Sequence, residues 1–168
     1  MSTIILSALY LIHLVGTVIW LGGLAMLVLV AWPALSAQPD SIEAEGPVHL
    51  LERRLRPYAN ISLIALLMTG MVQMGANPNY EGVLQFGNAW SVAMLAKHIV
   101  FAGMVLLSAI EQFALMPELD RALLLASRGD TSAAIRVRQI RGRLRLALVL
   151  MLALGLLVLL FTAVMTAL

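Results

Sequence analysis

Three side chains that could do chemistry lie inside long apolar stretches of the sequence: His13, Lys97 and His98. Ionisable groups inside a bilayer are costly and usually face the interior of a helix bundle. Each histidine lies about nine or ten residues from the end at which its apolar stretch begins. At about 1.5 Å of rise per residue, both imidazoles lie roughly 13–15 Å below the same membrane surface. We therefore expect two histidines from different helices at nearly one depth in the lipid.

Two neutral imidazoles at one depth can supply both axial nitrogens of one haem iron. Small residues one turn after His13 would let a flat macrocycle approach the helix, while Lys97 would reach a propionate. The residues that this hypothesis assigns to haem b are His13, His98, Lys97, Gly16, Thr17, Trp20 and Phe101. Bis-histidine ligation leaves no open iron position and therefore favours electron transfer. If one histidine is not a ligand, an oxidase with Lys97 as the candidate catalytic residue is favoured instead.

A second hypothesis assigns the same histidines to copper. Met68, Met71 and Met74 recur every third residue in the second apolar stretch, and Met94 lies one turn before His98. Thioether and imidazole ligands suit Cu(I). A structural role stays open beside both hypotheses, because methionine commonly fills cores and a buried histidine often only bonds a neighbouring helix.

The composition indicates an integral membrane protein. Of the 168 residues, 61% are hydrophobic, 12% are charged and none is cysteine. These values exclude a typical water-soluble domain, a disulfide scaffold and thiolate metal sites. Nucleotide-binding, hydrolase and zinc-protease motifs are absent from the sequence. We expect an all-α bundle of four transmembrane helices forming one domain over residues 1–168, with spans at about 4–32, 55–74, 88–116 and 146–168.

The arginines predict the orientation of the spans. All ten lie in or beside the first and third connections, and the second connection, residues 75–87, has neither Lys nor Arg. The positive-inside rule then puts both termini on the outer (periplasmic) side of a bacterial-type inner membrane, with the arginine-rich loops in the cytoplasm. We assign the arginine run at 136–145 to lipid headgroups and not to nucleic acid. Glu111 is expected to pair with Arg143 or Arg145, because an unpaired buried charge is costly.

Several helix ends and packing roles also follow from local residues. Asp40 and Glu43 have the spacing of a capping box, and the third helix should run past its span to Ser127. Asp130 is a candidate N-cap for a basic helix that continues into the last span. Trp90 is interpreted as an interfacial anchor, and the last span as a packing wall against lipid.

A short internal similarity supports a repeat of helix pairs. His13-Leu-Val in the first helix resembles His98-Ile-Val in the third, and these two helices cross the membrane in the same direction. A parallel repeat of this kind has its pseudo-twofold axis along the membrane normal, which could bring the two histidines face to face.

Motifs in three of the stretches resemble those of a known family. The segment His13-Leu-Val-Gly-Thr-Val-Ile-Trp-Leu-Gly-Gly resembles the opening helix of the copper resistance protein D (CopD) family, and Thr69-Gly70 and Met94-Leu-Ala-Lys97 also fit that family. The resemblance covers Leu9 to about Pro117. It implies a superfamily whose members are variously linked to copper uptake or to haem redox chemistry.

The same residues resemble the HemJ family of membrane protoporphyrinogen oxidases, which work with a b-type haem. The shared positions are His13, Trp20, Glu52-Arg53-Arg54 and Lys97. HemJ-like chains close their first helix with Pro-Arg-aromatic-Val-Tyr-His, whereas this chain reads Val28-Leu-Val-Ala-Trp-Pro. This departure weakens the case for porphyrinogen oxidation and leaves haem binding open.

Three functions therefore follow from the sequence. The leading hypothesis is a b-type haem protein in membrane electron transfer or oxidation, with a protoporphyrinogen-oxidase-like activity as one form of it. The alternative is copper transport or binding through His13 and His98 with Met68, Met71, Met74 and Met94. The third is a structural subunit of a membrane complex. The expected partners are the lipid bilayer, a redox partner that the sequence does not identify, and either further copies of the chain or other subunits, with no nucleic acid.

Overall fold

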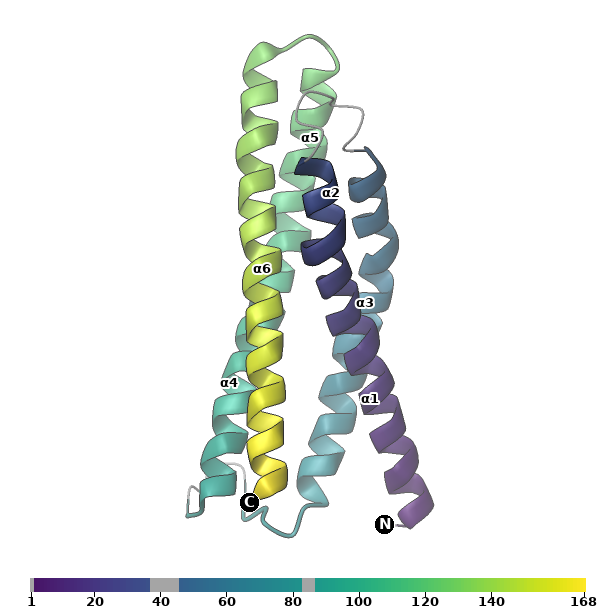
Figure 1. Ribbon diagram of the computed structural model, residues 1–168, viewed down its shortest axis with the longest axis vertical. Coiled ribbons are helices and arrows are strands. Elements are labelled where there is room, and N and C mark those ends of the chain that lie inside the picture. Colours follow the sequence, from purple (N-terminus) through teal and green to yellow (C-terminus); the bar gives the residue numbers. More distant parts are fainter. Residues whose placement is uncertain (1, 37–45, 83–86) are drawn as a thin grey trace.

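The computed structural model describes residues 2–36, 46–82 and 87–168, and within these ranges it contains helices and no strand. Four helices are long and apolar enough to cross a membrane, so the all-α four-helix prediction is confirmed (Figure 1). The capping box expected at Asp40 and Glu43 lies outside the described residues. The elements are α1 (Thr3–Met26), η1 (Leu27–Ala31), α2 (Trp32–Ser36), α3 (Gly46–Gly75), α4 (Ala89–Ile110), η3 (Glu111–Leu115), α5 (Met116–Ala126) and α6 (Thr131–Ala167).

The first helical run continues through Pro33, past the predicted end of the first span at about residue 32. A proline inside a helix lacks an N–H group, and its ring clashes with the carbonyl four residues earlier. Here the N–H group of Trp32 bonds the carbonyl of Leu27, five residues earlier, so η1 is one wider turn immediately before Pro33. The wider turn accommodates the proline ring, and the run ends only at Ser36.

A second wide turn before a proline occurs in the second half of the chain. The N–H group of Met116 bonds the carbonyl of Glu111, again five residues earlier and again directly before a proline, Pro117. His13 precedes its proline by twenty residues, and His98 precedes Pro117 by nineteen. The similarity between the two halves therefore extends from the histidine to the wide turn.

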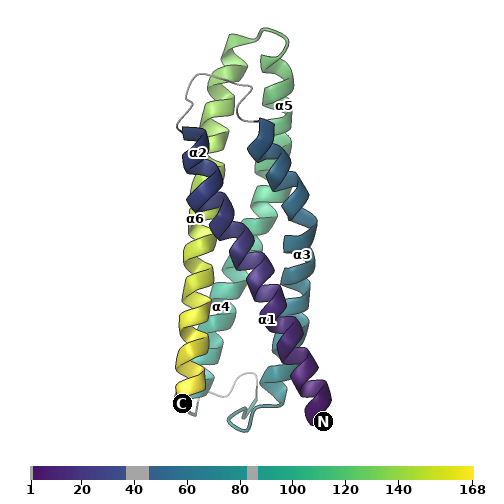
Figure 2. The same ribbon diagram turned by 45° about the vertical axis from the view of Figure 1, so that its right-hand side comes forward.

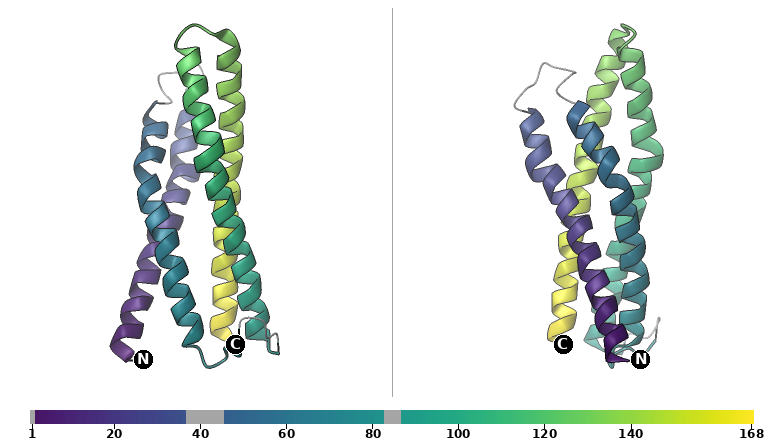
Figure 3. Two further views of the ribbon diagram at one scale, coloured as in Figure 1. Left: turned by 180° about the vertical axis from the view of Figure 1, so that it is seen from behind. Right: turned by 90° about the vertical axis from the view of Figure 1, so that its right-hand side faces the viewer.

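The helices are arranged as two pairs. α1 packs mainly against α3, and α4 packs mainly against α6. α1 crosses α3 at an angle (Figure 2). At this crossing Gly16 is buried, and a Cβ there would lie 3.4 Å from Leu66 Cγ and 3.6 Å from the carbonyl oxygen of Ser62. The two pairs separate towards the end of the bundle that carries both termini (Figures 1 and 3).

We call this end the terminal end and the opposite end, where α5 meets the start of α6, the arginine end. α6 has 37 residues and is roughly 55 Å long, whereas a bilayer core is about 30 Å thick. α5 and the first part of α6 therefore extend beyond the core as an antiparallel hairpin. Its buried side chains are Met116, Leu119, Ala122, Val137, Ile140 and Leu144.

The turn of this hairpin has the predicted caps. The third helical run ends with Ser127 as its C-cap, and Gly129 has φ +90°, a conformation that favours glycine. Asp130 accepts hydrogen bonds from the N–H groups of Ser132 and Ala133, so the predicted N-cap is confirmed. The hydrogen bonds from the Ser132 hydroxyl and these amides lower the pKa of Asp130.

A cluster of large side chains fills the middle of the bundle. Its buried members are Trp20, Leu24, Leu27, Leu63, Met104, Leu148 and Met151. Gly155 of α6 lies against this cluster, because a Cβ there would come 3.1 Å from Trp20 Cζ3 and 2.8 Å from Leu21 Cδ1. The absence of a side chain at Gly155 thus lets α6 approach α1.

Candidate functional site

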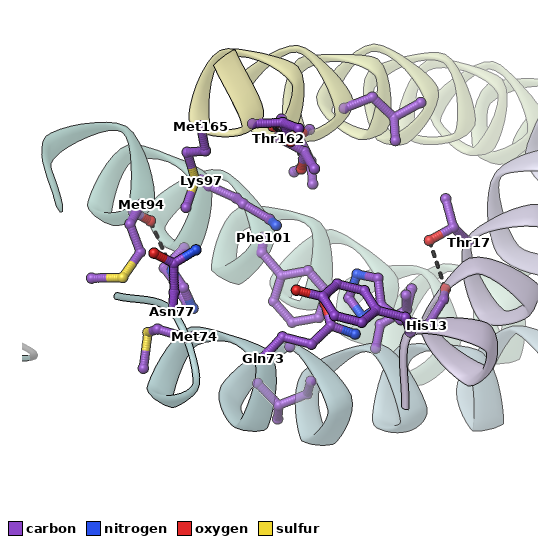
Figure 4. A pocket seen from close by; sticks show the side chains of 18 of the residues that line it. His13, Thr17, Gln73, Met74, Asn77, Met94, Lys97, Phe101, Thr162 and Met165 are labelled. Atoms are coloured by element: carbon purple, nitrogen blue, oxygen red, sulfur yellow. Dashed lines mark hydrogen bonds between the residues drawn. The ribbon is translucent and has the colours of Figure 1, made fainter. Parts of the chain in front are cut away.

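A cavity of about 540 Å³ lies at the terminal end of the bundle, lined by residues from all four long helices (Figure 4). This volume falls in the range of small-molecule and cofactor sites. Six of the seven residues predicted for a cofactor line it: His13, Thr17, Trp20, Lys97, His98 and Phe101. The seventh, Gly16, instead faces α3 at the crossing described above.

His13 is held in one tautomer by a residue of α3. Its Nδ1 atom lies 2.8 Å from Thr69 Oγ1, and the Thr69 hydroxyl donates its proton to the carbonyl oxygen of Ala65 at 2.6 Å. A hydroxyl has a single proton, so the oxygen of Thr69 must accept the hydrogen bond from Nδ1–H of His13. In the neutral ring the lone pair is then on Nε2, which is the atom free to bind a ligand.

His98 has the same tautomer for a different reason. Its Nδ1 atom lies 2.7 Å from the carbonyl oxygen of Met94, and a carbonyl can only accept. Neither histidine has a hydrogen-bond partner for Nε2 among the residues that the structure describes. Metal-binding histidines are usually oriented in this way, with one nitrogen donating to an oxygen and the other left for the metal.

The four methionines of the copper hypothesis divide into two groups. Met74 and Met94 line the cavity. Met68 and Met71 are 62% and 54% exposed and lie on the outward face of α3. Figure 4 shows Met74 and Met94 with Asn77 at one side of the cavity, whereas His13 lies at the other. In the described ranges no group of three or more His, Asp or Glu side chains could hold a metal.

A row of polar residues on α3 and the segment directly after it was not singled out as part of the site. Thr69, Gln73 and Asn77 follow one another at intervals of four, and the last two line the cavity. The amide nitrogen of Gln73 donates to the carbonyl oxygen of Leu9 at 3.3 Å. Polar residues at helical spacing in an apolar span usually face the bundle interior, and this pattern could have identified the α3 wall.

Two packing interpretations are corrected by the structure. Trp90 is only 4% exposed and lines the cavity, so it is not an interfacial anchor. The last span is more than a wall against lipid, because Thr162, Met165 and Thr166 of α6 also line the cavity.

Lys97 extends from α4 into the cavity, where Phe101 also projects (Figure 4). Its charge acts on His13, which lies on the facing helix pair. None of the described residues that line the cavity has a carboxylate side chain. The cavity therefore contains a cationic side chain whose charge no lining side chain balances.

The prediction that Glu111 pairs with Arg143 or Arg145 is wrong, because another arginine interacts with it. Arg143 and Arg145 are both exposed, and the guanidinium that acts on Glu111 is that of Arg56 on α3. Glu111 and Arg56 line a second, smaller cavity of about 60 Å³ together with Glu52. α6 brings only apolar side chains to that cavity, because its helical rotation turns the arginines outwards.

Comparison with known proteins adds one finding. The family described as "Copper resistance protein D" matches residues 50–165. This range contains Thr69, Lys97 and His98, but it begins after the helix that carries His13. No curated protein and no solved structure matches the chain. Since the matched range spans more than half of its length, the chain belongs to the copper resistance protein D family.

Proposed function

We propose that this protein binds Cu(I) in the cavity at the terminal end and passes it into the membrane. The observation that carries the proposal is that one cavity is lined by four soft ligands. These are the thioethers of Met74 and Met94 and the imidazoles of His13 and His98, each with a free Nε2. Thioether and imidazole favour Cu(I), whereas the described lining offers none of the Asp or Glu side chains that usually bind Mg²⁺ or Ca²⁺. The family name points to the same metal.

The positions of these ligands along the helices suggest an order of binding. Met74 is near the end of α3 and Met94 near the start of α4, so both lie close to the terminal end. His98 bonds the carbonyl of Met94 and belongs to the same helical turn. His13 lies further along the bundle, between these residues and the central cluster at Trp20. We infer that copper enters at Met74, Met94 and His98 and is then transferred to His13.

This arrangement also gives copper binding a structural consequence. Met74 belongs to the α1–α3 pair, and Met94 and His98 belong to the α4–α6 pair. A shared copper ion would therefore connect the two pairs at the end where they separate. The positive-inside rule makes this end the outer side of the membrane, so the proposed direction of entry is from outside.

The proposal is tested by Cu(I) binding to the purified full chain under reducing conditions, in competition with a chromophoric Cu(I) chelator. We expect Met74→Leu and Met94→Leu each to lower the affinity by about tenfold or more. Met68→Leu and Met71→Leu are matched controls, because they remove thioethers from the same region without touching the cavity. Equal affinities in all four variants, or no binding by the wild type, would overturn the proposal.

A second candidate function is supported by Lys97. Lys97 is a cation in a cavity whose described lining has no carboxylate side chain to pair with it, and Trp20 and Phe101 form part of the cavity wall. Such a cavity could also bind an anionic aromatic cofactor such as haem b. Bound haem would supply one-electron chemistry, His13 and His98 would offer Nε2 to its iron, and Lys97 would pair with a propionate. The visible spectrum separates the two: a Soret band with sharp bands on reduction, lost in His13→Ala, supports haem. A colourless protein with stoichiometric copper supports the main proposal.

A further inference from the structure

A second cavity lies on the other side of Trp20 from the cavity that His13 lines, towards the arginine end. Trp20 lines both cavities, so the two sites are stacked along the bundle. The second cavity has a volume of about 60 Å³, which would hold about two waters at ~30 Å³ each. Its polar lining consists of Glu52, Arg56, Tyr58 and Asn60 from α3, Ser108 from α4, and Glu111 and Gln112 from η3.

Glu52 is a buried carboxyl in this lining, and one of its two oxygens has no hydrogen-bond partner in the described part of the chain. It is 6% exposed, and its Oε1 atom is buried and has no hydrogen-bond partner among the described residues. The same holds for the Nε and Nη2 atoms of Arg56. An ionised carboxylate in this position carries a large desolvation cost, which the attraction of Arg56 offsets only in part. The lining is thus incomplete without a further species in the cavity.

The neighbouring amides bond each other and Ser108, and none of these bonds reaches Glu52 or Arg56. Asn60 and Gln112 donate to each other's carbonyl oxygens at 2.8 Å and 2.9 Å, and Gln112 also donates to Ser108 Oγ at 3.0 Å. Both amide protons of Gln112 and one of the two amide protons of Asn60 are therefore already used. What remains is two carboxyl groups, Glu52 and Glu111, that interact electrostatically with each other and with the single guanidinium of Arg56.

The charge of this group points to its occupant. With both carboxyls ionised, the Glu52–Arg56–Glu111 cluster has one negative charge in excess, and arginine stays protonated in proteins. The other elements that face the cavity bring no charge, since α1, η1 and α6 contribute only apolar groups such as Leu24, Leu27 and Met151. One added proton makes the cluster neutral without requiring the ligands or the volume of a metal ion.

We propose that Glu52 is a proton-binding site that exchanges a proton with the arginine-end side of the membrane. In the binding step, a proton from water adds to the Glu52 carboxylate and gives the neutral acid. In release, the same O–H bond breaks and the proton returns to water, while Arg56 keeps its charge and balances the carboxylate that remains. The 60 Å³ cavity has room for water that would connect Glu52 with the unpartnered nitrogens of Arg56. Carboxyls of this kind inside membrane spans mark proton pathways.

The proton-binding proposal can be tested in the absence of copper. A negative result would therefore contradict this proposal without bearing on the copper proposal. Infrared spectra of the metal-free full chain in liposomes, recorded over a pH series, report a protonated carboxyl through its C=O stretch, which shifts in ²H₂O. We expect such a band in the wild type, its disappearance at high pH, and its loss in Glu52→Gln. Glu118→Gln, an exposed carboxyl on α5, is the matched control and should leave the band unchanged.

Two further variants keep the test decisive. Glu52→Asp retains a carboxyl and should shift the band instead of removing it, which gives a readout even if Glu52→Gln folds poorly. Glu111→Gln removes the neighbouring charge and should keep the band but change by about tenfold the proton concentration at which it disappears. The proposal is overturned if the wild type shows no band at any pH, as a metal-cation occupant predicts, or if the band survives in Glu52→Gln and is lost in Glu111→Gln.

Discussion

The Nδ1 atom of His13 on α1 donates a hydrogen bond to the hydroxyl oxygen of Thr69 on α3, at 2.8 Å. Because the Thr69 proton is directed to Ala65, this bond selects the histidine tautomer and leaves Nε2 free. The bond also joins the two helices of one pair at the depth of the cavity. Thr69 is therefore a positioning residue for His13, and its hydroxyl is the group to test.

Replacing Thr69 with valine should slow copper transfer while leaving the shape of the helix interface unchanged. Valine has the volume of threonine but no acceptor, so the His13 ring loses its orientation. We expect the rate of Cu(I) uptake into proteoliposomes to fall by about 10–100-fold, the usual effect of removing such a partner of a metal-binding histidine. Thr69→Ser keeps the hydroxyl and should retain uptake near the wild-type rate. Equal loss in both variants would contradict the role of the hydroxyl.

Replacing Lys97 with glutamine separates the two cofactors by the sign of its effect. The Lys97 charge acts on His13, so its removal should strengthen the binding of a monovalent cation by about tenfold, which is ~1.4 kcal/mol. If the ligand is haem, the same change removes the partner of a propionate and should weaken binding. Cu(I) competition and haem titration of the same preparation measure both. Lower Cu(I) affinity in Lys97→Gln would contradict the copper account.

Gly155 and Gly142 of α6 provide a matched pair for the packing of the central cluster. Alanine at Gly155 places a methyl group against the Trp20 ring and should lower stability by about 1–3 kcal/mol. Alanine at Gly142 meets nothing within 4 Å and should raise stability by about 1 kcal/mol through helix propensity. Thermal unfolding in detergent compares the two variants. A stabilised Gly155→Ala variant would show that α6 does not need this close approach.

The cysteine-free sequence allows a direct test of orientation. Asn79 is exposed in the connection at the terminal end, and Ala134 is exposed at the start of α6 near the arginine end. A membrane-impermeant maleimide should label Asn79→Cys in intact spheroplasts and Ala134→Cys only after permeabilisation. The reverse pattern would place the arginines outside and refute the proposed direction of copper entry.

The sequence predicted the number of helices and several of their ends, because these depend on local properties. Span length follows from hydropathy, and Asn88 and Asp130 cap their helices with their own side chains. The continuation past Pro33 was missed because a wider turn before a proline depends on how the rest of the helix packs. The sequence also does not show which side of a helix faces the bundle. For this reason Trp90 was wrongly interpreted as an interfacial anchor, although it is buried.

The same limit applies to the candidate site. Residues three apart on a helix differ by about 60° in direction, so Met68, Met71 and Met74 cannot all face one cavity. Composition does not reveal which of the three methionines faces the cavity. In the structure Met74 lines the cavity, and Met68 and Met71 do not. Glu52 and Arg56 are one turn apart on α3, but Glu111 comes from η3, and its meeting with them depends on long-range packing that no local pattern records.

The most direct test of the copper account is X-ray absorption spectroscopy of the Cu(I)-loaded chain. The account predicts a first shell containing both nitrogen and sulfur in the wild type. The sulfur contribution should disappear in the Met74→Leu/Met94→Leu double variant and persist in the Met68→Leu/Met71→Leu double variant. A wild-type shell without sulfur, or one that the first double variant leaves unchanged, would contradict the assignment of copper to this cavity.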